Sequence, residues 1–404
     1  MSPVNPLLIL PALATALLTT SAFIKISHRK LTEVQYKTID GLRGYLAFFV
    51  FLHHSSLWYF YLHTGTWSEP PSHLFIHFGQ TSVALFFMIT GFLFLRKLMQ
   101  GKQKPINWLR FYMGRILRLC PVYLLVMIIC FIVVLSLTQW TIAGPFSAYA
   151  KGILQWGTFG ITGRPPVNHT FFMDKITAGA TWTLIYEWLF YSSLPFIGII
   201  FFKSGGNFFI VLISAAILFL IFYNNLIKPI HFYSFAIGAA AAFLVKKEKL
   251  FSRPGNTPFS IVALLCIALT IHFFETPYEI VPLTLIGISF IIIAAGNSIS
   301  GLLTLKVSRT IGQISYPLYL MHPVVLFIVF RFIFGFGNAA GMNLYVYWIM
   351  ISLIAAFTIC ICFLIHFFIE LPAMKQITRV TSFIKKWNLR TPGNPGNQRR
   401  HMEI

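Results

Sequence analysis

The chain has 404 residues, of which 57% are hydrophobic and only 10% are charged, and its formal net charge is +21 at pH 7. Because soluble domains carry about 25% charged residues, the composition excludes an ordinary soluble protein and predicts a body embedded in a membrane, where helices satisfy the backbone polar groups. No nucleic-acid-binding module interrupts the apolar runs, so we interpret the basic excess as a topology signal with affinity for membrane lipids and expect no nucleic-acid partner.

The apolar runs approach the ~20 residues that a helix needs to cross the hydrocarbon core. About eleven such runs follow one another, at 6–25, 42–62, 81–96, 117–139, 181–202, 207–223, 231–245, 258–274, 279–296, 311–333 and 345–369. The sequence therefore predicts an all-α fold, a polytopic transmembrane helical bundle of about 11 spans. The two runs within 207–245 are the weakest predictions of the set, because both are short.

The first run lacks the preceding positive charge of a cleaved signal peptide, because its flanking charges, beginning with Lys25, come after it. This pattern predicts an uncleaved anchor with the N-terminus outside and the C-terminus cytoplasmic. With that orientation, the predicted cytoplasmic stretches contain 26 of the 31 Lys and Arg residues. Residues 1–35 are then an N-terminal anchor span with a basic linker, and residues 375–404 a basic cytoplasmic tail that is partly disordered.

The second span carries ionisable residues, which are costly inside a bilayer and are functional candidates by default. Arg43 and His54 are eleven residues apart, a separation that returns to nearly the same helical face about 16 Å further along the axis. We expect both to face one groove, with Arg43 at the cytoplasmic end, His54 near mid-bilayer, and His53 pointing elsewhere. The alternative is that Arg43 only anchors the helix end and His54 bonds a neighbouring carbonyl.

The basic segment 96–118 places Arg115 and Arg118 at i and i+3, on one helical face. Arginine forks suit bidentate phosphate binding, so this face is a candidate site for a cytoplasmic donor that carries phosphates. The alternative is an ordinary positive-inside loop.

Glu187 lies about two turns into an otherwise apolar span. An isolated anion there requires a partner or a raised pKa, and either condition suits acid–base or orienting work. A purely structural ion pair is the alternative.

The span that begins near residue 311 places Ser315, Tyr319 and His322 at i, i+4 and i+7, so they share one face. His322 lies close to the predicted depth of His54. Two intramembrane histidines at matching depth, each on a polar stripe, favour a functional interpretation over a satisfied core histidine.

Several common site patterns are absent from the sequence. The five cysteines lie within or at the edge of apolar segments without zinc-ligand spacing, so we expect buried small side chains and no metal site. No nucleophile elbow, phosphate-binding loop, dinucleotide fingerprint or zinc-protease motif occurs. The external loops 63–80 and 140–180, rich in Trp, Pro and Gly, could pack a carbohydrate acceptor or form an interfacial aromatic belt.

Six short segments in the same order resemble the membrane-bound acyltransferase family 3, the OafA-like O-acyltransferases. Arg43 and His54 match its Arg-x10-His signature, Glu187 its Trp-x-Leu-Ser-x-Glu segment, and Tyr316 its Ser-Tyr-x-x-Tyr element. The sequence departs from the family pattern at Thr90 and Tyr186, where serine is frequent. The matching segments are 38–54, 81–95, 110–123, 182–191, 311–323 and 369–372.

The resemblance implies an acyltransferase domain over residues 36–374, with a family core of ten spans to which the run at 6–25 is extra. It implies an O-acetyltransferase of the bacterial inner membrane that moves an acetyl group from cytoplasmic acetyl-CoA, or another acyl-CoA, to a hydroxyl of a cell-surface or lipid-linked glycan such as O-antigen. Acyl-CoA is then the donor substrate, and no cofactor is bound.

The expected roles follow from the resemblance and the residue chemistry together. His54 is the general base or a transient acyl carrier, Arg43 orients or polarises the donor, and Glu187 positions the acceptor or the histidine. Arg115 and Arg118 are the expected donor-binding residues. The expected supporting residues are Ser315, Tyr316, Tyr319 and His322.

Two other classes remain open at this stage. A secondary transporter or polysaccharide export protein also uses intramembrane His, Arg and Glu, but it is expected to show repeats, and we find none. The other large family of membrane O-acyltransferases also has a membrane histidine, without the Arg-x10-His pattern. The sequence makes no prediction of the oligomeric state.

Overall fold

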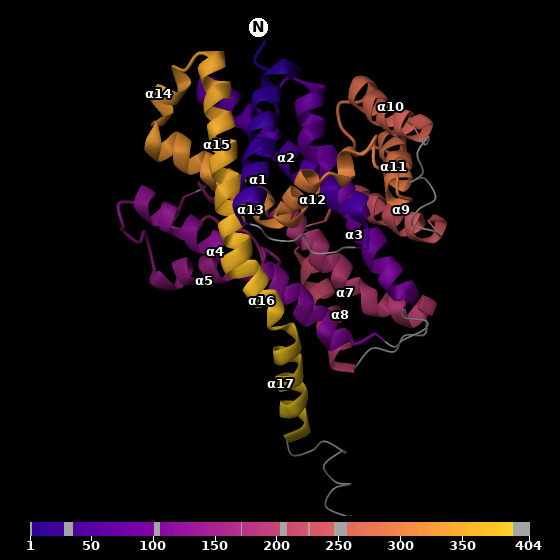
Figure 1. Cartoon of the computed structure of the whole chain (residues 1–404). Helices are drawn as coiled ribbons and strands as arrows, with labels where there is room; N and C mark the ends of the chain where they lie inside the picture. Colours follow the sequence, from indigo (N-terminus) through magenta and orange to yellow (C-terminus); the bar gives the residue numbers. More distant parts are fainter. Residues whose placement is uncertain are drawn as a thin grey trace, which may run out of the picture.

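The computed structural model describes residues 2–27, 35–100, 106–170, 172–202, 208–224, 227–245 and 257–390, and these residues are almost entirely helical (Figure 1). Within these ranges the only β-type pairing is one isolated bridge between Val167 and Thr170. The all-α prediction is confirmed. The main helices are α1 (Ile9–Ser27), α2 (Lys37–Thr64), α3 (His73–Gln100), α4 (Trp108–Leu137), α5 (Phe146–Gly157), α6 (Phe172–Ile176), α7 (Trp182–Phe202), α8 (Phe208–Tyr223), α9 (Ile230–Leu244), α10 (Thr257–Phe273), α11 (Ile280–Ala294), α12 (Lys306–Gln313), α13 (Ser315–Ile328), α14 (Phe336–Ala340), α15 (Leu344–Ile365), α16 (Leu371–Lys375) and α17 (Ile377–Arg390).

Several helices are long and apolar enough to cross a bilayer, so the chain is a multi-pass membrane protein. In the described ranges six segments meet both criteria, namely Pro6–Ser27, His73–Gln100, Trp108–Leu137, Trp182–Phe201, Ser315–Ile333 and Leu344–Lys386. Four other apolar helices, α8 to α11, are shorter. Helix α2 has 28 residues but is not in the apolar set, because it carries the polar residues singled out above. Each of the eleven predicted runs overlaps a helix, but a count of eleven spans is not established.

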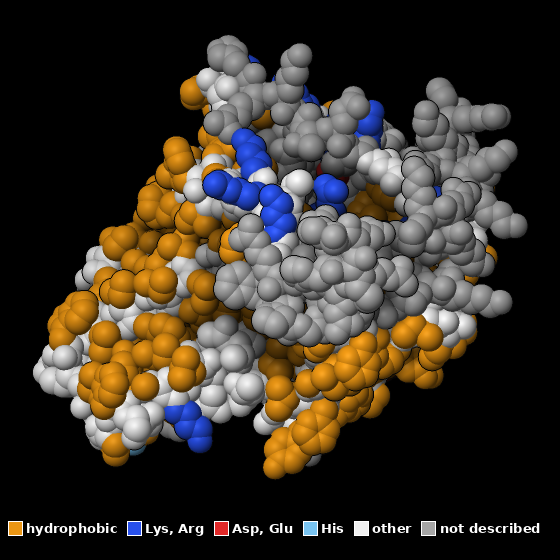
Figure 2. Space-filling view, turned by 90° about the horizontal axis from the view of Figure 1, so that it is seen from below, with side chains coloured by type: hydrophobic (Ala, Val, Ile, Leu, Met, Phe, Trp, Pro, Cys, Tyr) orange, Lys and Arg blue, Asp and Glu red, His pale blue; other side chains and the backbone are white. Residues whose placement is uncertain are grey.

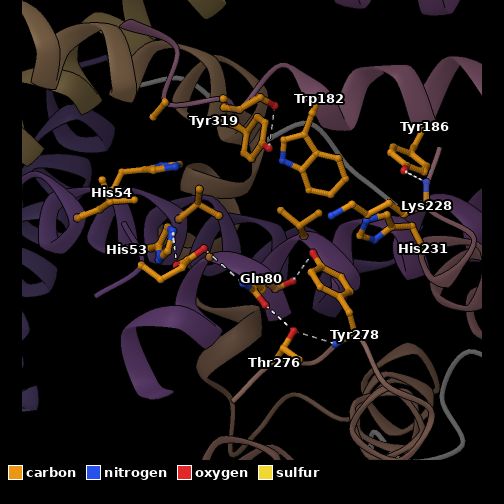
Figure 3. Close-up of a pocket in the computed structure, with 18 of the residues that line it drawn as sticks. His53, His54, Gln80, Trp182, Tyr186, Lys228, His231, Thr276, Tyr278 and Tyr319 are labelled. Carbon is orange, nitrogen blue, oxygen red and sulfur yellow. Dashed lines mark hydrogen bonds and ion pairs between the residues drawn. The ribbon is translucent and has the colours of Figure 1, made fainter. Parts of the chain in front are cut away.

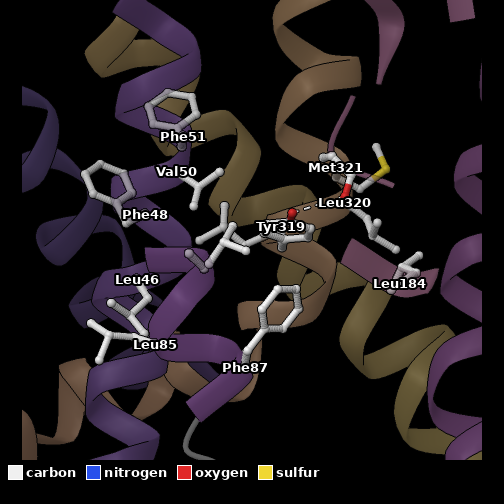
Figure 4. Close-up of a cluster of buried hydrophobic side chains, with 14 of the residues drawn as sticks. Leu46, Phe48, Val50, Phe51, Leu85, Phe87, Leu184, Tyr319, Leu320 and Met321 are labelled. Carbon is white, nitrogen blue, oxygen red and sulfur yellow. Dashed lines mark hydrogen bonds between the residues drawn. The ribbon is translucent and has the colours of Figure 1, made fainter. Parts of the chain in front are cut away.

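Helix α2 is the hub of the bundle, and it is buried over most of its length. It packs against α3, α12 and α13, and its side chains Leu46, Phe48, Val50 and Phe51 meet residues of α3 and α13 in the apolar cluster of Figure 4. The phenol of Tyr45 also hydrogen-bonds Ser308 of α12, with an oxygen–oxygen distance of 2.9 Å. The polar face of α2 is thereby enclosed by protein rather than by lipid.

The contact between α2 and α12 depends on glycines. A Cβ atom at Gly41 would overlap the carbonyl oxygen of Leu303, and one at Gly312 would overlap that of Asp40. A Cβ at Gly44 would meet the Gly312 amide nitrogen at 2.8 Å. Small residues of this kind let membrane helices approach closely, and here they fix the position of the helix that carries Arg43 and His54.

The ends of the chain pack on the same bundle. Helix α1 lies against α15 and α12, and Phe23 stacks on Phe363 with ring centroids 3.9 Å apart. Part of the predicted tail is ordered as helix α17, which contacts α4 and extends below the bundle in Figure 1. The sequence predicts disorder from residue 388, but residues 388–390 continue helix α17, and residues 391–404 lie outside the described residues.

Exposed side chains separate by type. Helices α8 and α10 present many exposed large hydrophobic residues outward, as membrane-facing helices do. Viewed from the α17 side, several Lys and Arg side chains gather in one region while the visible flanks are largely hydrophobic (Figure 2). Within the bundle, Arg118 and Arg309 interact electrostatically with Asp40 near one end of α2, and Lys175 bonds Tyr61 near the other.

The glycine contact yields a stability prediction. Gly312→Ala should lower the free energy of unfolding by at least about 1–3 kcal/mol, the usual cost of overpacking, because a backbone carbonyl cannot move aside as a side chain does. Thermal unfolding of the purified protein in detergent measures the change. Gly337→Ala is the matched control, since a Cβ there meets nothing within 4 Å, and an equal effect of both substitutions would contradict the interpretation.

Candidate active site

Two histidines from distant parts of the chain meet in the centre of the bundle. The Nδ1 atom of His54 on α2 lies 2.8 Å from the Nε2 atom of His322 on α13. Both side chains are buried, with 7% and 0% of their surfaces exposed. The sequence placed the two residues at similar depth, and the structure brings them into direct contact.

The hydrogen bonds of the pair determine which nitrogens carry protons. The Nδ1 atom of His322 lies 2.8 Å from the carbonyl oxygen of Leu318, which can only accept, so that nitrogen is the donor. The Nε2 atom of a neutral His322 then has a lone pair and accepts from Nδ1–H of His54. His54 is left with an unprotonated Nε2, the form that a general base requires.

His54 lines a central cavity of about 750 Å³ (Figure 3). Residues from both predicted external loops contribute to its wall, including Trp67, Glu69 and Arg164. The rest of the wall comes mainly from α3, α7, α9 and the segment before α11. The complete lining is Val50, His53, His54, Leu57, Trp67, Glu69, Gly79, Gln80, Val83, Arg164, Ala178, Gly179, Ala180, Trp182, Ile185, Tyr186, Lys228, Ile230, His231, Thr276, Tyr278 and Tyr319.

The expectation that His53 points elsewhere is wrong, because His53 lines the same cavity as His54. Its Nδ1 donates to the carbonyl oxygen of Phe75 at 2.8 Å, and its Nε2 lies 3.7 Å from Oε2 of Glu69. Adjacent residues of an ideal helix point in different directions. The cavity is nevertheless wide enough that both His53 and His54 line it.

Two smaller inner cavities adjoin the central one and share wall residues with it or with each other. The first, of about 50 Å³, is lined by Arg43, Glu187, Ser315 and Tyr319, and it shares Val83 and Tyr319 with the central cavity. The second, of about 80 Å³, shares Arg43 and Glu187 with the first and reaches Arg115 and Arg118. Arg43 and His54 therefore line neighbouring cavities rather than a single groove.

Arg43 belongs to a charge cluster at the inner cavities, in which four arginines and three carboxylates interact. We use this name for Asp40, Arg43, Arg115, Arg118, Glu187, Arg309 and Glu370. Opposite charges in near balance allow ionised groups to be buried, since each loses water but gains a partner.

Glu187 is held by the cluster and by a phenol. The hydroxyl of Tyr191, one turn further along α7, donates to Oε2 of Glu187 at 2.8 Å, and three arginines surround the carboxylate electrostatically. The Arg115 guanidinium lies over the ring of Phe94, 5.2 Å from its centroid. Glu187 thus has the arginine partners of a structural ion pair, and it also lines both inner cavities. Its surroundings are consistent with a structural role and with an orienting role at the site.

Arg118 has a carboxylate partner from the far end of the chain. Its Nε lies 3.7 Å from Oε1 of buried Glu370, whose Oε2 accepts from Nδ1 of His366 at 2.6 Å. His366 and Glu370 bound a π-helical turn, a local widening that occurs frequently at functional sites. Sequence reasoning overlooked His366, although it is an ionisable residue within the predicted span 345–369.

The candidate residues of α13 line the inner cavities, and some of them also link α13 to neighbouring segments by hydrogen bonds. Ser315 and Tyr319 line the first inner cavity, and the Ser315 hydroxyl has no hydrogen-bond partner within the described residues. Tyr319 donates to the carbonyl oxygen of Ala180 at 3.1 Å. Tyr316 lines both inner cavities and donates to the carbonyl oxygen of Leu119 at 2.8 Å, which ties α13 to α4.

Sequence reasoning missed part of the central cavity. Lys228, His231 and Tyr278 come from a short connection, the start of α9 and the loop before α11, and they share no spacing in the sequence. The only signal was their location on predicted external ends of spans. Within the described residues, no group of three or more His, Cys, Asp or Glu side chains is placed to hold a metal ion.

Comparison with known proteins identifies one family. The sequence profile described as an acyltransferase domain, that of acyltransferase family 3, matches residues 36–367, most of the chain. No curated protein matches the chain. No solved structure matches it either.

The charge cluster yields a prediction about Glu187. Glu187→Gln should reduce the free energy of unfolding by up to about 3 kcal/mol, because it leaves arginine charges without compensation. Tyr191→Phe removes only the hydrogen bond to the same carboxylate and should cost about 1–2 kcal/mol. Thermal unfolding of both variants tests the order, and a Glu187→Gln protein as stable as the wild type would show that the carboxylate is not part of a structural ion pair.

Proposed function

The chain belongs to acyltransferase family 3, and from this premise we propose that it transfers an acetyl group from acetyl-CoA to a hydroxyl of a cell-surface or lipid-linked polysaccharide such as O-antigen. The observation that carries the proposal is the His54–His322 pair, of which His54 lines the central cavity. That cavity shares the wall residues Val83 and Tyr319 with the first of the inner cavities that lead toward the arginines. Membership in an acyltransferase family disfavours the transporter alternative.

The donor is proposed to enter at the arginine end of the inner cavities. Arg115 and Arg118 are only partly buried, and guanidinium groups bind phosphate oxygens in a bidentate manner. Glu370 holds Arg118 in place while leaving other donors of its guanidinium available for phosphates. The thioester would then extend inward past Arg43, which is proposed to polarise its carbonyl group.

The acceptor is proposed to occupy the central cavity with one hydroxyl at His54. The hydroxyl oxygen attacks the thioester carbon, its proton passes to Nε2 of His54, and the carbon–sulfur bond breaks. The proton then neutralises the departing thiolate of coenzyme A. His322 keeps Nδ1 of His54 protonated, and the carbonyl of Ala178 interacts with the His54 ring where it can stabilise the imidazolium. A transient acyl-histidine is the other form of the same proposal.

The proposed setting is the bacterial inner membrane, with the N-terminus outside, the arginine end cytoplasmic and the central cavity open to the outside. The basic residues support this arrangement, since 26 of the 31 Lys and Arg residues fall in the stretches predicted to be cytoplasmic. Donor and acceptor would thereby reach one histidine from opposite sides of the bundle.

His54→Ala should fold and insert but lose about 10²–10⁴-fold in acetyl transfer, the usual contribution of a general base. His322→Phe should lose less, because it removes only the partner that fixes the His54 tautomer. Release of coenzyme A by purified protein, together with mass spectrometry of the host's surface polysaccharide, measures both. His63→Ala is the matched control, since His63 is an exposed histidine on the same helix. Normal acetyl transfer by His54→Ala would contradict the assignment of His54 as the general base.

The orientation gives a separate prediction. In a background without native cysteines, Lys151→Cys should react with a membrane-impermeant maleimide in intact cells, because α5 is proposed to lie outside. Lys306→Cys should react only after the membrane is permeabilised. Both lysines are exposed, so accessibility within the protein does not bias the comparison. The reverse labelling pattern would overturn the proposed topology.

A further inference from the structure

The central cavity has two ends with different chemistry (Figure 3). His53 and His54 lie at one end, and Tyr186, Lys228 and His231 lie at the other. Its volume of about 750 Å³ falls within the ~300–1,000 Å³ of pockets that enclose ligands of several rings. A ligand with its reactive hydroxyl at His54 therefore has room to extend to the Lys228 end, by which we mean Arg164, Trp182, Tyr186, Lys228, His231 and Tyr278. Arg164 is included because it interacts electrostatically with Tyr186.

His231 is a buried side chain that lacks a partner. Only 5% of its surface is exposed, and its Nδ1 has no hydrogen-bond partner within the described residues. Its ring is fixed by Trp182, Tyr186 and Tyr278, with centroids at 4.9, 4.9 and 4.5 Å. The three rings therefore hold His231 rigidly as part of the cavity wall, where it can contact a bound ligand.

The charges at the Lys228 end favour an anion. Arg164 and Lys228 both line the cavity, and within the described residues neither forms an ion pair with a carboxylate within 4 Å. Asp174 interacts with Arg164 at longer range and is not part of the cavity wall.

Glu69 is the carboxylate that lines the cavity, and it lies beside His53. Glu69 is engaged there by His53 and accepts from Gln80 at 3.4 Å. Glu69 also interacts electrostatically with Tyr278, but within the described residues it forms no ion pair within 4 Å with Arg164 or Lys228.

The start of helix α9 adds to this field. Its first turn, which includes Ile230 and His231, lines the cavity and contains no acidic residue. The helix dipole makes such an end favourable for negative charge, although the amides of His231 and Phe232 already donate to the carbonyl oxygens of Lys228 and Pro229. Together with Arg164 and Lys228, it gives the Lys228 end an anion-attracting character.

We propose that the Lys228 end is a subsite for an anionic group of the acceptor, a carboxylate or a phosphate, which is bound there while a hydroxyl lies at His54. The aromatic rings of Trp182, Tyr186 and Tyr278 offer flat apolar faces beside the charged groups, which suits a sugar ring that carries such an anion. The inference rests on the proposed function for the role of His54, and it narrows the acceptor from any glycan to an acidic or phosphate-linked one.

Binding of defined probes to the full chain in nanodiscs tests the subsite without any transfer reaction. Methyl glucuronide should bind about tenfold more tightly than methyl glucoside if the anion is a sugar carboxylate, and farnesyl phosphate more tightly than farnesol if it is a lipid phosphate. Either preference should weaken as salt is added. Equal binding of both charged probes and their neutral counterparts would overturn the proposal.

Variants assign the preference to the Lys228 end. The double substitution Arg164→Gln and Lys228→Gln should reduce binding of the preferred anionic probe about threefold to tenfold, the size of one or two partly exposed charge contacts. His231→Phe should weaken it as well, and Lys228→Arg should retain it. Lys151→Gln is the control, because it removes an exposed lysine that does not line the cavity.

The outcomes separate the subsite from the enzyme assignment. If the anionic probe binds in a charge-dependent way but the wild type never releases coenzyme A, the subsite stands and the proposed function fails. If transfer depends on His54 while neutral and anionic probes bind alike, the proposed function stands and the subsite fails. Unchanged probe affinity in the charge variants would also place the anion elsewhere.

Discussion

A buried polar group in this protein can find a partner only inside an apolar body, and the contacts of the described bundle follow from that constraint. The imidazoles of His54 and His322 satisfy each other at 2.8 Å, and the carbonyl oxygen of Leu318 fixes the second ring. In water the same pair would be worth little, because each ring would bond solvent equally well. In a low-dielectric interior the contact determines where both protons reside, and so which nitrogen faces a substrate.

The charge cluster obeys the same constraint on a larger scale. Four arginines and three carboxylates from α2, α4, α7, α12 and the turn after α15 neutralise one another around the inner cavities. Stability and function are therefore difficult to separate there, since a residue that binds donor phosphates also compensates a buried carboxylate. Arg118 illustrates this, because Glu370 both balances its charge and limits its orientation.

The three cavities lie in a row between the buried arginines and the buried histidines. Neighbouring cavities share Val83, Tyr319, Arg43 and Glu187 as walls, so the arginine-lined end and the histidine-lined end are linked by side chains with contacts on both sides. The central cavity is the widest part and is surrounded by aromatic rings and uncompensated cations. Its composition differs from that of the inner cavities, where opposite charges are nearly balanced.

The sequence by itself determined the fold class, the family and most of the candidate residues. Apolar runs of membrane length can only form helices in a bilayer, and ionisable residues within them are rare enough to stand out, as Arg43, His54, Glu187 and His322 do. Helical spacing also grouped Ser315 with Tyr319, and both line the same cavity. These inferences are local, and local geometry is what periodicity encodes.

Only the tertiary structure decided which distant residues meet. His54 and His322 are 268 positions apart in the sequence, and their contact depends on how the helices pack. The same holds for the approach of Glu370 to Arg118 and for the convergence of Lys228, His231 and Tyr278. Helix packing is set by small contact residues such as Gly41 and Gly312 and by the shapes of opposing faces, which no single-helix pattern contains. The assignment of His53 failed for the same reason, because the width of a cavity belongs to the assembly of helices rather than to any one of them.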